Sequence, residues 1–474
     1  MALAWERVDS PEALGLSGQA VLDFLRDSKR LSIHTLAIVR DHKAYVLARR
    51  PFRADSPHTL FSLSKSFCSM AAGMAVDEGL LRYDDRLTEL LSDSLPKGYD
   101  RRLDQVTLHH LLSMSSGLDE KSDHEIRSSY DWARSALACK VQHTPGTHFH
   151  YNTMGTYLAG RMVARRANMS LRDYLMPRLF EPLGIVKPQW DCCPMGYNAG
   201  GFGLHLGVGG LAKAAQLLLD GGVWQGRRLL SADYLARATV CQIDNRNPDE
   251  KDPHPDWSSG YGYQFWMARK GRFRGDGMFG QVMMVDWDNN LAVCCTAGTN
   301  LMGDELDTLH RLMDGLLTLP PQDGDGRAAL RLMEKRPVAS APRDGGEEVG
   351  LEGSYRAGDG KTLRVETPDV NTLRLFLEGG GLPYPIKFTF SRRKAHRGEF
   401  MPWPQGERPQ AYLGRFGVWR GALGARVVMP EAPYRLLARL EKTEDGLLMR
   451  VDSIGLWEGE FRFVRTDRNQ AGGG

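Results

Sequence analysis

The stretch Phe61-Ser62-Leu63-Ser64-Lys65-Ser66-Phe67 decides how the rest of this sequence is interpreted. Ser62 and Lys65 are three residues apart, and on a helix this spacing places them on one face, one turn apart. A free serine hydroxyl is a poor nucleophile that needs an adjacent base. The N-terminus of the expected helix would also favour negative charge developing there. The quartet therefore predicts a nucleophile with its base, although a capping serine with a solvated lysine is the alternative for so short a motif.

The surroundings of the quartet favour the catalytic interpretation. A candidate strand, Tyr45–Ala48, precedes it, and the apolar run Met70–Val76 follows. The residues Asp77-Glu78-Gly79 then end the expected helix. A nucleophile placed between a strand and a buried helix is a known catalytic setting.

Composition limits the classes of protein to consider. The chain has 474 residues, 42% of them apolar and 25% charged, which is typical of soluble globular proteins of two or three domains. A formal charge of +3 does not indicate a nucleic-acid partner. The sequence shows neither a signal peptide nor an apolar run of membrane-spanning length, so no membrane partner is expected. Seven cysteines, with adjacent pairs at 192–193 and 294–295, suggest thiols in a reducing compartment, and we predict a cytoplasmic protein.

Candidate strands lie at both ends of the first 318 residues, with helical and loop segments between them. The strand-like runs are Thr35–Val39, Ala44–Leu47, Tyr261–Trp266, Gln281–Val285 and Leu291–Thr296. The two ends are therefore expected to build one sheet, with a helical insertion on one side. We predict a catalytic domain at 1–318, a linker at 319–349 and a domain of short alternating strands at 350–474, forming a small antiparallel barrel or sandwich.

Two further polar clusters carry candidate site residues. Tyr151-Asn152-Thr153 contains a tyrosine that, beside a lysine, could shuttle the serine proton, although a packed tyrosine is the commoner role. Arg274–Gln281 contains three glycines that would let a ligand approach the backbone closely, with a tight turn as the alternative.

Together and in this order, the three clusters resemble the serine β-lactamase and penicillin-binding-protein superfamily, particularly its class C-like branch of esterases, amidases and D-amino-acid peptidases. Similar blocks are Leu60–Phe67, Val106–Leu118, Leu179–Ile185 and Gly260–Trp266. The resemblance covers roughly residues 15–318. It implies an α/β (α+β) fold in which an antiparallel sheet is flanked by helices and joined to an all-helical subdomain. The C-terminal part resembles the lipocalin-like β-barrel domains that are often appended to this family.

The resemblance also implies roles for individual residues. Ser62 would attack a carbonyl and form an acyl-enzyme, while Lys65 and Tyr151 would share the proton transfers. The backbone N–H of Ser62 and one from the third cluster would form the oxyanion hole. Water would normally deacylate the intermediate, and another nucleophile could replace it. No metal or other cofactor is implied.

The second motif departs from the family's commonest form, Tyr-x-Asn. Here Thr153 stands in the last position, and it lacks the amide that typically contacts a substrate carbonyl and the lysine. Asn152 precedes it and could point elsewhere. Both residues are candidates for substrate contact.

The third motif, usually Lys/His-x-Gly, has two registers here. The first is Gly275-Asp276-Gly277 with the N–H of Met278 in the oxyanion hole, and the second is Met278-Phe279-Gly280 with that of Gln281. We favour the second, because Gln281 opens an apolar strand. Neither register begins with a cation, which argues against a contact with a substrate carboxylate. Asp276 could repel carboxylates, receive an amine or cap a turn.

We therefore predict a serine hydrolase that acts through an acyl-enzyme on a small ester or amide, as carboxylesterases do. The alternatives are a D-amino-acid peptidase, amidase or β-lactamase, an acyltransferase or cyclase of the same fold, and a catalytically silent binding module. The intact set of Ser62, Lys65 and Tyr151 argues against the silent module. The sequence is also compatible with a homo-oligomer.

Overall fold

The computed structural model describes residues 5–119, 123–247, 249, 251, 253–321, 325–335, 342–346, 349–382, 385–400 and 409–466. Two compact units are present: Met1–Ala48 with Arg53–Lys335, and Arg49–Phe52 with Arg336–Gly474. Among the helices in the described ranges, none is long and apolar enough to span a bilayer. Each unit is described separately below.

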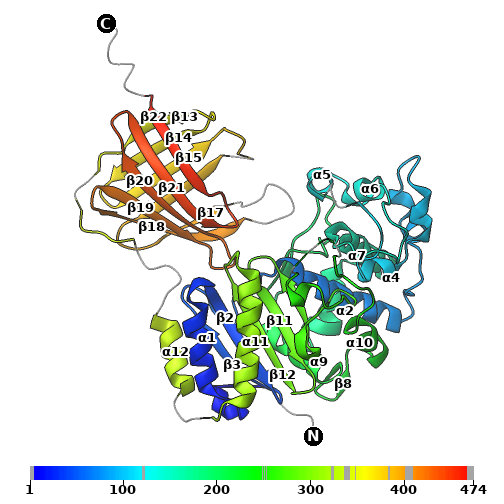
Figure 1. The fold of residues 1–474 in the computed structure, drawn as a ribbon. Coiled ribbons are helices and arrows are strands. Elements are labelled where there is room, and N and C mark those ends of the chain that lie inside the picture. Colours follow the sequence, from blue (N-terminus) through cyan, green and yellow to red (C-terminus); the bar gives the residue numbers. More distant parts are fainter. Residues whose placement is uncertain are drawn as a thin grey trace. The chain divides into compact units, whose positions relative to one another are not determined.

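The first unit is built on a sheet to which both ends of its chain contribute (Figure 1). Its order among the described residues is β1-β3-β2-β12-β11-β10-β9, antiparallel except where β1 pairs with β3. The strands are β1 (Glu6–Val8), β2 (Ile33–Arg40), β3 (Lys43–Ala48), β9 (Trp266–Met267), β10 (Phe273–Gly277), β11 (Gln281–Asp286) and β12 (Leu291–Ala297). The predicted sheet of two chain ends is confirmed, and β2 and β12 meet at its centre.

Alternate side chains of the central strands enter two different cores, as the period of two requires. One core includes Ile38 and Val293 and is covered by α1 (Gly18–Asp27), α11 (Met302–Thr318) and α12 (Asp325–Lys335). The segment expected to be a linker thus contains a helix of the first unit, whose Ala329 and Met333 are in this core. The opposite core includes Val39 and Ala292 and is covered by α9 (Val208–Leu219).

A mainly helical region continues from that second core. It contains α2 (Ser64–Asp77), α3 (Leu87–Leu90), α4 (Leu108–Leu112), α5 (Asp123–Ser128), α6 (Trp132–Leu137), α7 (Thr153–Ala167), α8 (Leu171–Leu175) and α10 (Ala232–Ala238). Short strand pairs are also present: β4 (His58–Thr59), β5 (Gln189–Trp190), β6 (Leu204–Leu206), β7 (Val223–Trp224) and β8 (Arg227–Arg228). The apolar helix α2 is buried along almost its whole length and packs against α7.

The second unit contains a closed β-barrel, which confirms the predicted barrel. Among its described residues, nine strands form the ring in the order β16-β15-β14-β13-β22-β21-β20-β19-β18, closed by the β16–β18 pair, while β17 extends β18. The bounds are β13 (Gly353–Ala357), β14 (Thr362–Asp369), β15 (Thr372–Glu378), β16 (Ile386–Ser391), β17 (His396–Phe400), β18 (Gln410–Trp419), β19 (Ala422–Val428), β20 (Arg435–Lys442), β21 (Gly446–Ile454) and β22 (Gly459–Arg465). Closure leaves no long unpaired edge in the ring.

One expected strand is wrong. The run Tyr261–Trp266 is mostly irregular: Tyr261 makes only isolated bridges, and a regular strand begins at Trp266. Gln264 within it has a positive φ of 62°, which a regular strand does not permit. Its side chain donates to the carbonyls of Leu111 and Leu112, so this segment joins the helical region to the sheet.

Candidate active site

The predicted nucleophile lies where a short 3₁₀ turn, Phe61–Leu63, runs into α2. Phe61 before it has a positive φ of 47°, a conformation that is costly for a residue with a β-carbon. Ser62 is therefore presented on a sharp bend at the N-terminal end of a buried helix. The helix dipole and its first N–H groups would stabilise negative charge at this place.

Lys65 is brought to Ser62 as the spacing predicts. Its side-chain nitrogen is 3.1 Å from Ser62 Oγ, and the residue is only 1% exposed. It also donates to Thr153 Oγ1 at 3.2 Å and to the carbonyl oxygen of Gly201 at 2.8 Å. Hydrogen bonds of this kind offset the cost of burying an ammonium group. The nitrogen is thus fixed beside the serine by acceptors from two other segments.

Tyr151, the third residue of the predicted set, presents its aromatic ring to the Lys65 side chain. The Lys65 nitrogen is 4.8 Å from the Tyr151 ring centroid. The Tyr151 ring stacks on Trp266, with centroids 5.4 Å apart and an interplanar angle of 20°. Arg274 lies 5.6 Å from the Trp266 ring, so the stack is supported from a buried cation.

The two residues that follow Tyr151 have different positions. Thr153 contacts Lys65, which gives it the lysine contact expected of the family's asparagine. Asn152 is the N-cap of α7: its Oδ1 accepts from the Gly155 N–H at 2.7 Å, and its amide donates to the Leu118 carbonyl at 3.4 Å. Because both ends of the Asn152 side chain hold the fold, we exclude it from the candidate substrate contacts.

The third cluster forms the end of β10 and the turn into β11, and its geometry favours the first register. A β-carbon added to Gly277 would overlap the Leu60 carbonyl oxygen and lie 3.1 Å from the Ser62 backbone nitrogen. A β-carbon added to Gly280 would instead meet the carboxyl of Glu305, on α11. The glycine that packs on the nucleophile turn is therefore Gly277, and the residue that follows it is Met278.

The remaining residues of this cluster support the strand. Asp276 is 7% exposed and pairs with the fully buried Arg274 at 3.0 Å. The Gln281 side chain is buried and donates to the carbonyls of Met278 and Ala297, each at 3.1 Å. Met278 itself is 55% exposed. This packing favours the register in which Met278 follows the motif over the expected one, in which Gln281 does.

Sequence reasoning missed Gly201, Trp266 as a support of Tyr151, and Glu305. A signal for the first was present in Ala199-Gly200-Gly201-Phe202-Gly203, a glycine-rich stretch within the helical region. A β-carbon at Gly201 would lie 2.8 Å from both Thr153 Cγ2 and the Thr153 carbonyl oxygen, so only glycine fits there. Nothing in the sequence linked this stretch to Lys65.

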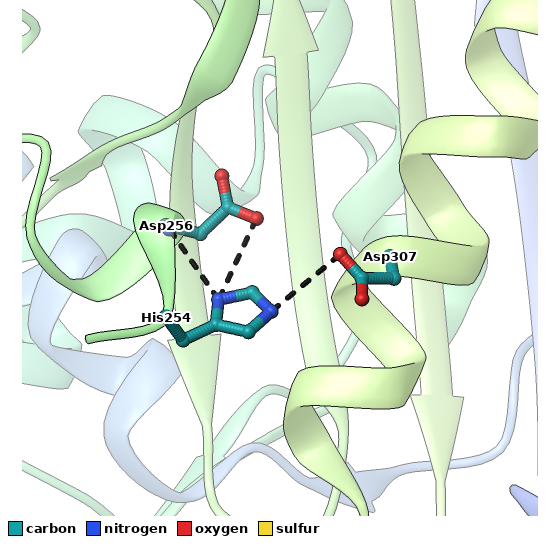
Figure 2. Close-up of side chains that lie close together, drawn as sticks. All are labelled: His254, Asp256 and Asp307. Carbon is teal, nitrogen blue, oxygen red and sulfur yellow. Dashed lines mark hydrogen bonds and ion pairs between the residues drawn. The ribbon is translucent and has the colours of Figure 1, made fainter. Parts of the chain in front are cut away.

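One side-chain cluster has the composition of a metal site. His254, Asp256 and Asp307 place ligand atoms within 4.8 Å of one another (Figure 2). However, Arg269 donates to Asp256 and to Asp307, each at 2.7 Å, and His310 Nε2 donates to Asp256 at 3.1 Å. Since a guanidinium already neutralises these carboxylates, the residues fit an ion-pair network better than a metal centre. Burial would raise the pKa of Asp256, but the hydrogen bonds from His310 and Arg269 outweigh it and hold that pKa well below its usual range.

The chain is similar to several known proteins. The β-lactamase family model matches residues 25–312. Monacolin J acid methylbutanoyltransferase of Aspergillus terreus is 28% identical over 159 residues, 29% of this chain and 38% of that protein. The 6-aminohexanoate-dimer hydrolase of Paenarthrobacter ureafaciens is 22% identical over 255 residues, 50% of this chain and 65% of that protein.

A solved structure extends the likeness beyond the first unit. The octameric penicillin-binding protein homologue from Pyrococcus abyssi aligns with a TM-score of 0.50 and 17% identity, covering 89% of this chain and 99% of that one. At this identity the likeness concerns the fold alone. The family match spans more than half of this chain, and the chain belongs to the β-lactamase family, whose members are generally serine hydrolases.

Proposed function

We propose that this protein is a serine hydrolase that transfers the acyl group of a small, uncharged ester or amide to Ser62 and then to water. The observation that carries the proposal is the 3.1 Å hydrogen bond between buried Lys65 and Ser62 Oγ. In its neutral amine form Lys65 is a proton acceptor beside a hydroxyl at a helix N-terminus, which is what activation of a serine requires.

In the acylation step, Ser62 Oγ attacks the substrate carbonyl carbon while its proton passes to Lys65 or Tyr151. The backbone N–H groups of Ser62 and Met278 are the proposed oxyanion donors, because Gly277 lets β10 pack directly on the nucleophile turn. The proton then passes to the leaving alcohol or amine as the tetrahedral intermediate collapses. Deacylation repeats these steps with water as the nucleophile.

We propose an uncharged substrate because neither of two positions on β10, where a cation could meet a substrate carboxylate, offers one. The motif begins with Gly275 where the family usually has lysine or histidine, and Arg274 is fully buried against Asp276. Neither residue offers a positive charge to a substrate carboxylate. A proficient β-lactamase or a peptidase for carboxylate-terminated peptides is therefore disfavoured against an esterase or amidase.

The decisive experiment is intact-mass spectrometry after incubation with a fluorophosphonate probe. We expect one adduct on the wild-type protein and none on Ser62→Ala. Ser64→Ala is the matched control, since Ser64 is a serine two residues away whose hydroxyl accepts from the Leu204 N–H. Absence of an adduct on the wild type, or its persistence in Ser62→Ala, would contradict the proposal. Comparing the turnover rates of p-nitrophenyl esters, D-alanyl amides and penicillin then ranks the substrate classes.

A second candidate is acyl transfer to an alcohol or amine. It is favoured by the names of matching relatives, such as the methylbutanoyltransferase of Aspergillus terreus, although the match spans less than half of that protein. Acylation of Ser62 would be unchanged, and only the second nucleophile would differ. Mixing the acyl-enzyme with a series of alcohols and amines tests this, because a transferase would give ester or amide product in excess of free acid.

A further inference from the structure

A carboxyl group that the proposed mechanism does not use lies directly behind the turn between β10 and β11. Glu305, in the first turn of α11, is 0% exposed. A β-carbon added to Gly280 would lie 2.6 Å from Glu305 Oε1 and would overlap Oε2, so the carboxyl group packs against the α-carbon of this glycine. The acid and the turn therefore occupy one tightly filled space.

The surroundings of Glu305 suit a neutral acid and not a carboxylate. The thiol of Cys295 lies 3.6 Å from Oε1, whereas Oε2 is buried and has no hydrogen-bond partner among the described residues. Two titratable groups face Glu305: the Cys295 thiol, on β12, and the Asp276 carboxylate, on β10. Asp276 forms an ion pair with Arg274. Burial, opposed by the Cys295 hydrogen bond and reinforced by the Asp276 charge, raises the pKa of Glu305 to about 8.

The turn that Glu305 supports carries the proposed oxyanion donor. Phe279 and Gly280 both have positive φ, 66° and 88°. The Gln281 amide holds the Met278 carbonyl, and the Thr299 N–H holds that of Phe279 at 3.2 Å. The Gly280 end of the turn rests on the titratable side chain of Glu305. A movement at that end would be passed to Met278, two residues away, and to its N–H.

We propose that Glu305 is a positioning residue: as a neutral acid it holds the oxyanion turn in place, and loss of its proton to solvent displaces the turn and stops acylation. This inference rests on the proposed function of Ser62. A carboxylate buried without a cation is strongly disfavoured, so an ionised Glu305 must gain water or donors. The turn at Gly280 is in direct contact with the Glu305 carboxyl group, and we expect this turn to move when the group ionises. Removal of one oxyanion donor lowers kcat about 10²–10³-fold, which sets the expected size of the effect.

The test compares pH–rate profiles for acylation by p-nitrophenyl acetate. Wild type is expected to lose activity as the pH rises through about 8, the pKa of Glu305. Glu305→Gln, which keeps the shape and stays neutral, should retain the activity at pH 7 and lack this alkaline loss. Asp304→Asn is the matched control, because it removes an exposed carboxylate from the same helical turn and should behave as wild type. A Glu305→Gln profile that coincides with that of wild type would overturn the inference.

A second measurement tests the role of Glu305 independently of whether Ser62 is the nucleophile. It uses a variant that does not turn over substrate. In the Ser62→Ala background, the infrared band of a protonated carboxyl should disappear near pH 8, and the Met278 amide resonance should move with the same midpoint. Glu305→Gln should remove both changes, and Glu305→Ala serves if the glutamine variant does not fold. A carboxyl band that is already absent at pH 6 would overturn the inference even if Ser62 proves to be the nucleophile. If instead the probe forms no adduct while both signals titrate together, the proposed function alone fails.

Discussion

Lys65 lies closer to the carbonyl oxygen of Gly201, at 2.8 Å, than to the hydroxyl of Ser62, at 3.1 Å. The lysine is therefore held as firmly by a loop of the helical region as by the residue it is proposed to activate. This loop comes 136 residues after the lysine in the chain. The position of the base consequently depends on how closely the loop approaches α7.

The first prediction concerns that approach. In Gly201→Ala the new methyl group would meet Thr153, so the loop should move and Lys65 should lose its acceptor. We expect kcat to fall by about 10²-fold, the effect of a displacement near 1 Å. Gly155→Ala, in the adjacent helix, is the control, since its β-carbon would have ordinary contacts at 3.7 Å and should preserve kcat. Equal activity of the two variants would contradict the role given to the loop.

Thr153 offers a more conservative test of the same base. Thr153→Val keeps the shape of the side chain and removes the hydroxyl that accepts from Lys65. Loss of one buried hydrogen bond to a charged group costs about 1.5–3 kcal/mol, so kcat/KM should fall by roughly 10- to 100-fold. Thr153→Ser restores the hydroxyl and should recover most of the rate. If the serine variant is as slow as the valine variant, packing and not the hydrogen bond is responsible.

The register of the third motif can be tested at Gly277, with a glycine of the barrel as the control. Gly277→Ala should push β10 off the nucleophile turn, because its β-carbon would overlap the Leu60 carbonyl. We expect the rate of probe labelling to fall about 10²–10³-fold, as when an oxyanion donor is lost. Gly358→Ala, in the barrel with no atom within 4 Å, should label at the wild-type rate. Wild-type labelling of Gly277→Ala would favour the register that begins at Met278 instead.

The fourth prediction concerns the ion-pair network around Asp256. Its folded pKa is lowered, so its contribution to stability is present at pH values above its unfolded pKa, near 4, and is lost as the pH falls further. Asp256→Asn leaves Arg269 and His310 without a carboxylate, and it should destabilise the protein by about 3–5 kcal/mol at pH 7. Urea unfolding at pH 7 and pH 3 measures this. The difference from wild type should be smaller at pH 3, and a constant difference would refute the assignment.

The same network gives a prediction about metals. Because Arg269 already occupies the space between Asp256 and Asp307, prolonged treatment with EDTA should change neither the melting temperature nor the esterase rate. Added Zn²⁺ at low micromolar concentration should likewise leave the melting temperature unchanged. A rise in melting temperature on adding Zn²⁺, abolished in Asp307→Asn, would show that the metal displaces the guanidinium.

Much of the fold could be predicted from the sequence because its signals are local. The mainly apolar runs of β11 and β12 and the apolar helix α2 each lie within one short run of residues. The spacing of Ser62 and Lys65 is equally local. The run Tyr261–Trp266 is expected to be a strand, but the hydrogen bonds of Gln264 to Leu111 and Leu112 hold it in another conformation.

The rest of the site depends on contacts between distant segments. Gly277 and Gly280 are both glycines in a turn-like stretch, and only the surface each one meets distinguishes them: the nucleophile turn for the first, Glu305 for the second. Asn152 looks like a motif residue, but the helix it caps determines its orientation. No spacing within the chain reveals such partners. Neither the register of the third motif nor the capping role of Asn152 could therefore be decided from the sequence.

The central position of β2 and β12 in the sheet has a consequence for protein synthesis. The hydroxyls of Thr35 and Thr296 lie 2.6 Å apart across these strands, although the two residues are 261 positions apart in the chain. At ~5–20 residues per second, a ribosome that has made the first strand needs on the order of tens of seconds to deliver the second. For most of that time a nascent chain contains Ser62 and Lys65 without β10 and the turn that carries the proposed oxyanion donor. Translation that stops before β10 should therefore yield chains that never label with the probe.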